Sequence, residues 1–125
     1  MEDFVNYEIA NKLKNLGFEE STYHYYNIDD IRYCRDDYPS DHNGDPLREF
    51  EISAPTISQV LKWLREEKRL HIAIDIWGRT WGYDIIELTS GNSLHWTAYR
   101  EDIKSYEDAA LDGIEYILDN LDNLI

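Results

Sequence analysis

The chain has 125 residues and a formal net charge of −14, and 42% of its residues are hydrophobic. This apolar content excludes an intrinsically disordered chain, and the length predicts a single domain, residues 1–125, with its own core. The negative charge repels phosphate backbones, so it disfavours nucleic-acid binding and favours solubility and a basic protein partner.

The cysteine content and the first residues bear on the cellular compartment. Cys34 is the only cysteine, so the chain can form neither an intramolecular disulfide nor a zinc site built on cysteines. The residues after Met1 lack the basic and apolar regions of a signal peptide. No apolar run approaches the roughly 20 residues of a membrane-spanning helix. We therefore expect a cytoplasmic protein without a membrane partner.

The first half of the chain is predicted to contain one helix and short strands. Apolar residues recur at helical spacing over residues 3–16, and Gly17 is a natural helix stop. Alternation over residues 23–28 predicts a strand. Residues 29–49 are rich in aspartate and contain Pro39, Gly44 and Pro46, which predicts turns and an exposed loop with a strand near residues 31–34. A further short strand is expected at residues 50–52.

The clearest folding signals lie between residues 52 and 77. Thr56 and Gln59 form a capping box after Pro55, and apolar residues then recur at helical spacing. At Leu70 the period changes to two, which predicts a half-buried strand. The apolar side of that strand carries Leu70, Ile72, Ile74 and Ile76.

The second half of the chain is predicted to form an antiparallel meander and a final helix. The expected strands are residues 70–77, 81–88 and 93–99, with turns at Gly78-Arg79-Thr80 and at residues 89–92. The last helix begins at Ser105. The fold class is α+β: a helix, irregular strands, a helix, three antiparallel strands and a helix. Both later helices are expected to pack on the Leu70 side of the sheet.

Strict alternation places aromatic side chains on the opposite face of this sheet, together with His71, Asp75 and His95. We expect the N-terminal half to cover this face, because large exposed apolar patches are uncommon on monomers. An uncovered face would be a protein interface, where Trp and Tyr are favoured. The candidate interaction surface joins these aromatic residues to the acidic side of the last helix: Trp77, Trp81, Tyr83, Tyr99, Glu107, Asp108, Asp112, Glu115 and Asp119.

Metal sites and enzymatic chemistry have little support in the sequence. His71, Asp75 and His95 are suitable metal ligands in type, but the outer strands that carry the histidines lie roughly 10 Å apart across the sheet. The loop from Asp41 to Asp45 fails the calcium-loop pattern, because Pro46 and Ile52 stand where glycine and glutamate are needed. We therefore predict an acidic turn there, no cofactor and no enzymatic activity.

Three resemblances to known families concern parts of the chain. Residues 56–121 resemble the double-stranded-RNA-binding topology, but residues 105–108, Ser-Tyr-Glu-Asp, stand where that family has lysines. The residues from Tyr106 resemble the strand-to-helix segment of HicB-type antitoxins. The segments EIANKLKNLGF (8–18), ISAPTISQVLKWLRE (52–66) and residues 106–118 resemble small proteins of unknown function from phages and mobile elements of gut anaerobes. The last resemblance implies a mobile-element context and no catalytic residue.

Three functional hypotheses follow. The first is a non-enzymatic interaction or accessory protein of a phage or mobile element. The second is an acidic mimic of nucleic acid, which would inhibit a nucleic-acid-binding protein through the last helix and the Asp29–Asp45 loop. The third is a small metal-dependent hydrolase with a pocket lined by His71, Asp75 or His95.

Overall fold

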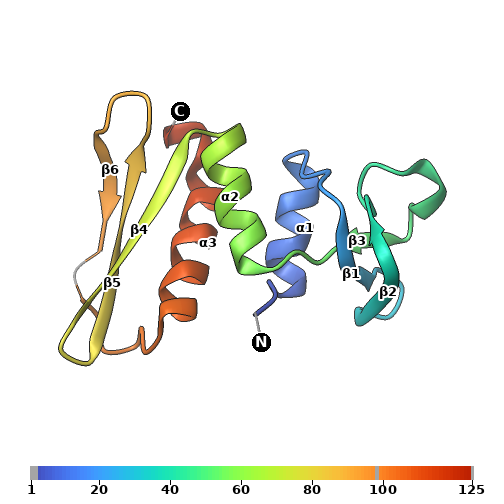
Figure 1. The fold of residues 1–125 in the computed structure, drawn as a ribbon, viewed down its shortest axis with the longest axis horizontal. Helices are drawn as coiled ribbons and strands as arrows, with labels where there is room; N and C mark the ends of the chain where they lie inside the picture. Colours follow the sequence, from blue (N-terminus) through green and yellow to red (C-terminus); the bar gives the residue numbers. More distant parts are fainter. Residues whose placement is uncertain (1–2, 98, 125) are drawn as a thin grey trace. The chain divides into compact units, whose positions relative to one another are not determined.

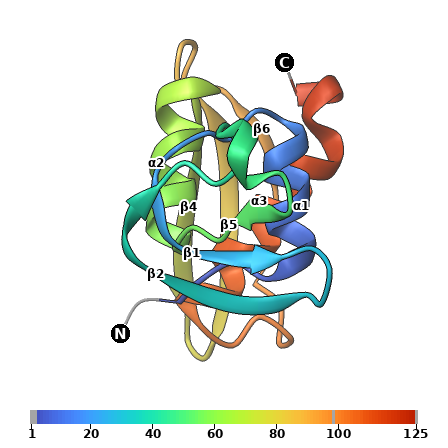
Figure 2. The same ribbon diagram turned by 90° about the vertical axis from the view of Figure 1, so that its right-hand side faces the viewer.

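The computed structural model describes residues 3–97 and 99–124 and confirms the α+β class (Figures 1 and 2). The chain divides into two compact units, residues 1–56 and 57–125, each with one three-stranded antiparallel sheet. We describe each unit by itself. The single domain expected from the chain length stays a prediction.

The unit of residues 1–56 contains a sheet in the order β2–β1–β3, with the first helix against β3. Both strand pairs are antiparallel, and Tyr25 on the central strand pairs with Cys34 on one side and Ser53 on the other. The elements are α1 (Tyr7–Asn15), β1 (Thr22–Asn27), β2 (Arg32–Ser40), the 3-10 helix η1 (Pro46–Arg48) and β3 (Glu51–Ser53).

The first helix ends where the sequence predicts but begins later. Gly17 has a φ of +88°, and the amide of Phe18 donates to the carbonyl of Leu13 at 3.0 Å, which closes the helix end. At the start, the side chain of Asn6 accepts from the amide of Ile9 at 2.9 Å. Asparagine is among the strongest N-caps, so the helix begins after Asn6 and not at residue 3.

The predicted loop over residues 29–49 contains a nine-residue strand, β2. The strand continues past the predicted residues 31–34 to Ser40, and the register with β1 shifts over Asp36, Asp37 and Pro39, between the pairs Arg35–His24 and Ser40–Thr22. These turn-forming residues are tolerated because β2 is an edge strand, where proline and charged side chains disturb no further pairing. The predicted acidic turn is present after β2, where Asp41 accepts from the amide of Gly44 at 2.8 Å.

The unit of residues 57–125 is a β4–β5–β6 meander with two helices on one face of its sheet (Figure 1). The second helix contacts β4, whereas the last helix contacts β4 and β5 and also packs against the second helix. This arrangement confirms the predicted helix packing. The elements are α2 (Ile57–Glu67), β4 (Leu70–Trp77), β5 (Thr80–Glu87), β6 (Ser93–Trp96) and α3 (Tyr106–Leu124).

The core of this unit lies between the helices and the sheet. Leu70, Ile72 and Ile85 are buried there against the helices. Gly113 lets α3 approach closely, since a Cβ atom at this position would lie 3.0 Å from Cγ2 of Ile72. Ile76 was expected on the buried side as well, but 45% of it is exposed. Burial along β4 therefore decreases toward the β4–β5 turn.

The β4–β5 turn is one residue shorter than predicted, and this changes the faces of β5. Trp77 pairs with Thr80, so only Gly78 and Arg79 form the loop. A shift of one residue moves every side chain of a strand to the opposite face. As a result, Trp81 pairs with Ile76 and Tyr83 with Ile74, on the helix-covered face.

Candidate functional site

The second face of the β4–β5–β6 sheet, here called the open face, is not packed against α2 or α3. Odd-numbered residues of β4 and even-numbered residues of β5 share it, because Asp75 pairs with Gly82 and Ala73 with Asp84. Trp96 of β6 pairs with Asp84 and joins the same face. Strands β4, β5 and β6 contain no lysine or arginine. The face therefore presents aromatic, small and acidic residues.

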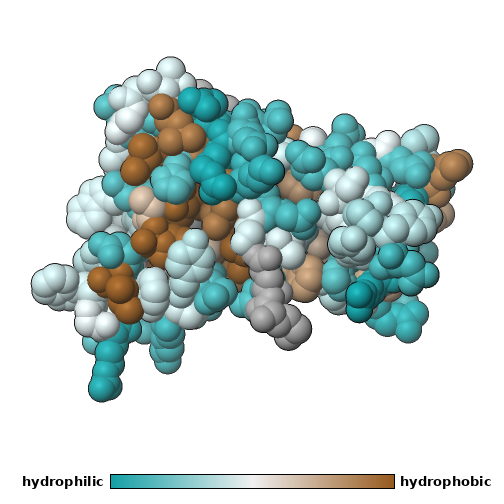
Figure 3. All heavy atoms as spheres, in the orientation of Figure 1, coloured by the Kyte–Doolittle hydropathy of each residue, from teal (hydrophilic) through white to brown (hydrophobic). Residues whose placement is uncertain are grey.

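Three aromatic side chains of this face are exposed. Trp77 is 74% exposed, Trp96 66% and Tyr99 43%. In the view of Figure 3, hydrophobic residues and residues of intermediate hydropathy reach the surface over the β4–β5–β6 sheet. Large exposed aromatic residues on one sheet face are typical of a contact surface. The expectation that the N-terminal half covers this face stays a prediction.

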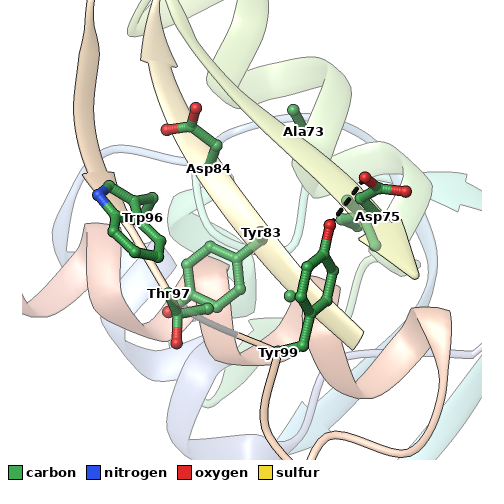
Figure 4. Close-up of a pocket in the computed structure, with 9 residues that line it drawn as sticks. Ala73, Asp75, Tyr83, Asp84, Trp96, Thr97 and Tyr99 are labelled. Carbon is green, nitrogen blue, oxygen red and sulfur yellow. Dashed lines mark hydrogen bonds between the residues drawn. The ribbon is translucent and has the colours of Figure 1, made fainter. Parts of the chain in front are cut away.

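A groove of about 600 Å³ lies on the open face (Figure 4). Its floor is low because Ala73 and Gly82 are small, while Trp96 and Tyr99 stand at opposite ends of it. A Cβ atom at residue 82 would lie 3.3 Å from the Tyr99 ring, so glycine allows this ring to lie on the strand. The lining residues are Ala73, Ile74, Asp75, Gly82, Tyr83, Asp84, Trp96, Thr97 and Tyr99.

Two carboxylates flank the groove. Asp75 accepts from the hydroxyl of Tyr99 at 3.0 Å and from the amide of Ile76 at 2.8 Å. Asp84 accepts from the hydroxyl of Ser93 at 2.5 Å. Within residues 3–97 and 99–124, neither carboxylate has a lysine or arginine partner. The hydrogen bond to Asp75 raises the pKa of Tyr99, since a carboxylate acceptor favours the protonated phenol.

Two of the predicted surface aromatics lie on the wrong face for that role. Tyr83 is only 4% exposed, and its hydroxyl donates to Asp112 of α3 at 2.7 Å. Burial, followed by this hydrogen bond, raises the pKa of Tyr83. Trp81 is half-buried and packs edge-to-face on Tyr106, with ring centroids 6.3 Å apart. Only Trp77 and Tyr99 of the predicted four belong to the open face, and Trp96, which was not predicted, joins them opposite Asp84.

The predicted group of His71, Asp75 and His95 is not brought together. His95 pairs with Ile85 on the helix-covered face, and its ring stacks on Tyr116 of α3 at 3.7 Å. His71 pairs with Ile86 on the open face. The two histidines therefore lie on opposite sides of the sheet, because His95 pairs with Ile85, which pairs with Ile72, the residue after His71. In the described residues, no group of three or more His, Cys, Asp or Glu side chains is arranged to hold a metal ion.

The acidic residues of α3 have mixed environments. Asp112 accepts from Arg100 at 3.1 Å as well as from Tyr83, and Asp108 lies in the first turn beside the cap residue Ser105, to which its amide donates at 3.0 Å. These two residues therefore have structural partners. Glu107 is half-buried, while Glu115 and Asp119 line a second hollow, of about 380 Å³, together with His95 and Arg100.

A buried polar cluster around His42 was not predicted from the sequence. His42 is fully buried, with Nδ1 2.5 Å from Glu51 and Nε2 3.1 Å from the carbonyl oxygen of Thr22. Arg48 donates to Glu51 at 2.9 Å and to Asp36 at 3.2 Å. The cluster links β1, β2, η1 and β3, so its evident role is to fix the loop between β2 and β3. No spacing in the sequence connects these residues.

Comparisons with known proteins give no relative: no protein family, no curated protein and no solved structure matches this chain. The resemblance to phage and mobile-element proteins thus stays a prediction. Among the described residues, no helix is both long enough and apolar enough to cross a membrane.

Proposed function

We propose that the protein is a non-enzymatic interaction module that binds another protein through the open face of the β4–β5–β6 sheet. The observation that supports this proposal best is the exposure of Trp77 and Trp96 on the open face, where Trp96 also lines the groove. Tryptophan and tyrosine are the residues that most often supply binding energy at protein interfaces, since each buries a large area at a small cost in entropy.

The charge of the molecule indicates which partners fit. A net charge of −14 repels nucleic acid and other acidic surfaces and attracts basic proteins over several ångströms. The open face follows the same trend, because its strands carry Asp75 and Asp84 and no cation. The proposed partner is therefore a basic protein. A cytoplasmic location and a role as an accessory protein of a phage or mobile element belong to the same proposal and rest on the sequence alone.

Selection from a random peptide library tests this function. The wild-type protein is used for selection, and each enriched peptide is then tested against Trp96→Ala and Trp77→Ser. Tyr38→Ala is the matched control, because Tyr38 is an aromatic residue with 62% exposure in the other unit. We expect enriched peptides to lose at least tenfold in affinity for an open-face variant and to bind the control unchanged. Peptides that bind all variants equally, or no enrichment at all, would contradict the proposal.

A further inference from the structure

We infer that the groove between Trp96 and Tyr99 is a subsite for the guanidinium group of an arginine side chain of the protein partner. This inference rests on the proposed function and names the chemistry of its central contact. Three features support it: the placement of the two carboxylates, the acceptor capacity that they keep, and the aromatic ends of the groove.

The carboxylates are placed to receive one cation between them. Asp84 pairs with Ala73 and Asp75 pairs with Gly82, so the two acids are diagonal neighbours on one face. Diagonal positions across antiparallel strands are about 7–8 Å apart at Cα, a span that a forked guanidinium can reach with two of its five donors. Figure 4 shows the two carboxylates on either side of Ala73. The small side chain of Ala73 leaves the space between them open.

Both carboxylates keep acceptor capacity. From donors among the described residues, Asp75 accepts two hydrogen bonds and Asp84 accepts one, whereas a carboxylate offers about four lone-pair sites. The Tyr99–Asp75 bond also fixes one wall of the groove, because it holds the ring over Gly82. The acceptors are therefore oriented before any ligand binds, which lowers the entropic cost of binding.

The aromatic ends of the groove favour a flat cation. Arginine presents a planar, weakly hydrated guanidinium that stacks on aromatic rings, and it bonds carboxylates at the same time. Lysine carries a compact, strongly hydrated point charge, so it stacks less well on aromatic rings and binds such a site more weakly. A nucleobase would also stack, but it would meet two carboxylates and none of the cations that single-stranded nucleic-acid sites require. A second copy of this chain fits poorly, since it carries the same net charge of −14.

Calorimetric titration with defined peptides tests the inference. The probe is a synthetic decapeptide with arginine at alternate positions, and its two comparison forms replace arginine by lysine or by citrulline, a neutral isostere. We expect the arginine peptide to bind at least tenfold more tightly than the citrulline form and more tightly than the lysine form. Equal binding of the citrulline form would overturn the cation subsite, and equal binding of the lysine form would overturn the assignment to arginine.

Variants with matched charge distinguish binding at the groove from a general attraction of the peptide to the negative charge of the protein. The variant with Asp75→Asn and Asp84→Asn should bind the arginine peptide at least tenfold more weakly, and Trp96→Ala should weaken it as well. The control, Glu66→Gln with Glu67→Gln on α2, removes the same two charges away from the groove and should bind like the wild type. If the control lost affinity for the arginine peptide equally, the effect would be due to net charge, and the subsite would be wrong.

The two experiments together distinguish a failure of the guanidinium subsite from a failure of the proposed function. If library peptides depend on Trp96 while the arginine decapeptide does not bind, the interaction face stands and the guanidinium subsite is wrong. If no peptide of either kind depends on the open face, both are wrong. Thermal unfolding of each variant, compared with the wild type, shows whether a loss of binding reflects a loss of fold.

Discussion

The two faces of the β4–β5–β6 sheet carry the same hydrogen bond in two different settings. On the helix-covered face, the hydroxyl of Tyr83 donates to Asp112 at 2.7 Å, and on the open face that of Tyr99 donates to Asp75 at 3.0 Å. The first tyrosine is 4% exposed and the second 43%. Both bonds raise the pKa of the phenol, but burial is the larger cause for Tyr83 and the hydrogen bond is the larger cause for Tyr99.

This comparison shows how one pair of groups serves two purposes. A buried hydrogen bond to a carboxylate contributes to folding, because breaking it leaves a desolvated polar group without a partner. An exposed bond of the same kind contributes little to stability, since water replaces either partner. Its effect is to hold a side chain in one place, in this case the Tyr99 wall of the groove. Substitutions on the two faces of the sheet test this division.

Alanine substitutions at two neighbouring isoleucines of β5 should give the largest difference in the free energy of unfolding. Ile85 is fully buried under the helices, so Ile85→Ala should lower the free energy of unfolding by about 2–5 kcal/mol, through lost burial and the cavity that remains. Ile86 lies on the open face and is half-buried, and Ile86→Ala should cost about 1 kcal/mol or less. Urea unfolding followed by circular dichroism measures both values. Equal costs would mean that the two faces are equally packed.

Removing each tyrosine hydroxyl in turn should show that the two hydrogen bonds contribute differently to stability. Tyr83→Phe should cost about 1–2 kcal/mol, because Asp112 loses a buried donor, although it keeps its hydrogen bond to Arg100. Tyr99→Phe should change stability by less than about 0.5 kcal/mol. The same variant should weaken binding to the groove, since the ring loses its anchor on Asp75. A stability cost for Tyr99→Phe as large as that for Tyr83→Phe would contradict the view that the exposed bond contributes little to stability.

Alkaline titration should show the burial of Tyr83 directly. An ordinary tyrosine has a pKa of about 10, and both Tyr83 and Tyr33 have a raised pKa in the folded protein, chiefly because of burial. Above pH 10 the unfolded chain releases these protons while the folded protein keeps them, so stability must fall as the pH rises. Urea midpoints between pH 8 and 11 measure this fall. It should be smaller in Tyr83→Phe, whereas a fall unchanged in that variant would contradict the assignment.

The sequence predicts the architecture of residues 57–125 well because its local signals are strong and agree. The cap at Thr56, the apolar stripe of α2 and the change of period at Leu70 each act within a few residues, and α2 and β4 begin where they indicate. The faces of β5 depend instead on one residue of the turn. Thr80 opens the strand opposite Trp77, and nothing in the composition of Gly78-Arg79-Thr80 distinguishes a two-residue from a three-residue loop.

Residues 1–56 were less predictable because non-local polar contacts organise them. His42, Glu51 and Arg48 meet only after the chain has folded, and the aspartates that read as a loop include Asp36, a member of this cluster. Propensity rules count such residues as turn formers, whereas their tertiary partners make them part of a sheet. For the candidate site, the sequence indicated the correct sheet and two of its three exposed aromatic residues, Trp77 and Tyr99. It missed Trp96, which only the β5–β6 register places opposite Asp84.

At Trp96 we expect a small effect on folding beside a large effect on binding. Trp96 is 66% exposed, so Trp96→Ala should change the free energy of unfolding by less than about 0.5 kcal/mol. Trp81→Ala serves as its counterpart on the helix-covered face, where the loss of the packed ring against Tyr106 should cost clearly more. Chemical unfolding of both variants gives the two values. A destabilised Trp96→Ala protein would show that this tryptophan is part of the core, and the open face would then lose its main anchor for a partner.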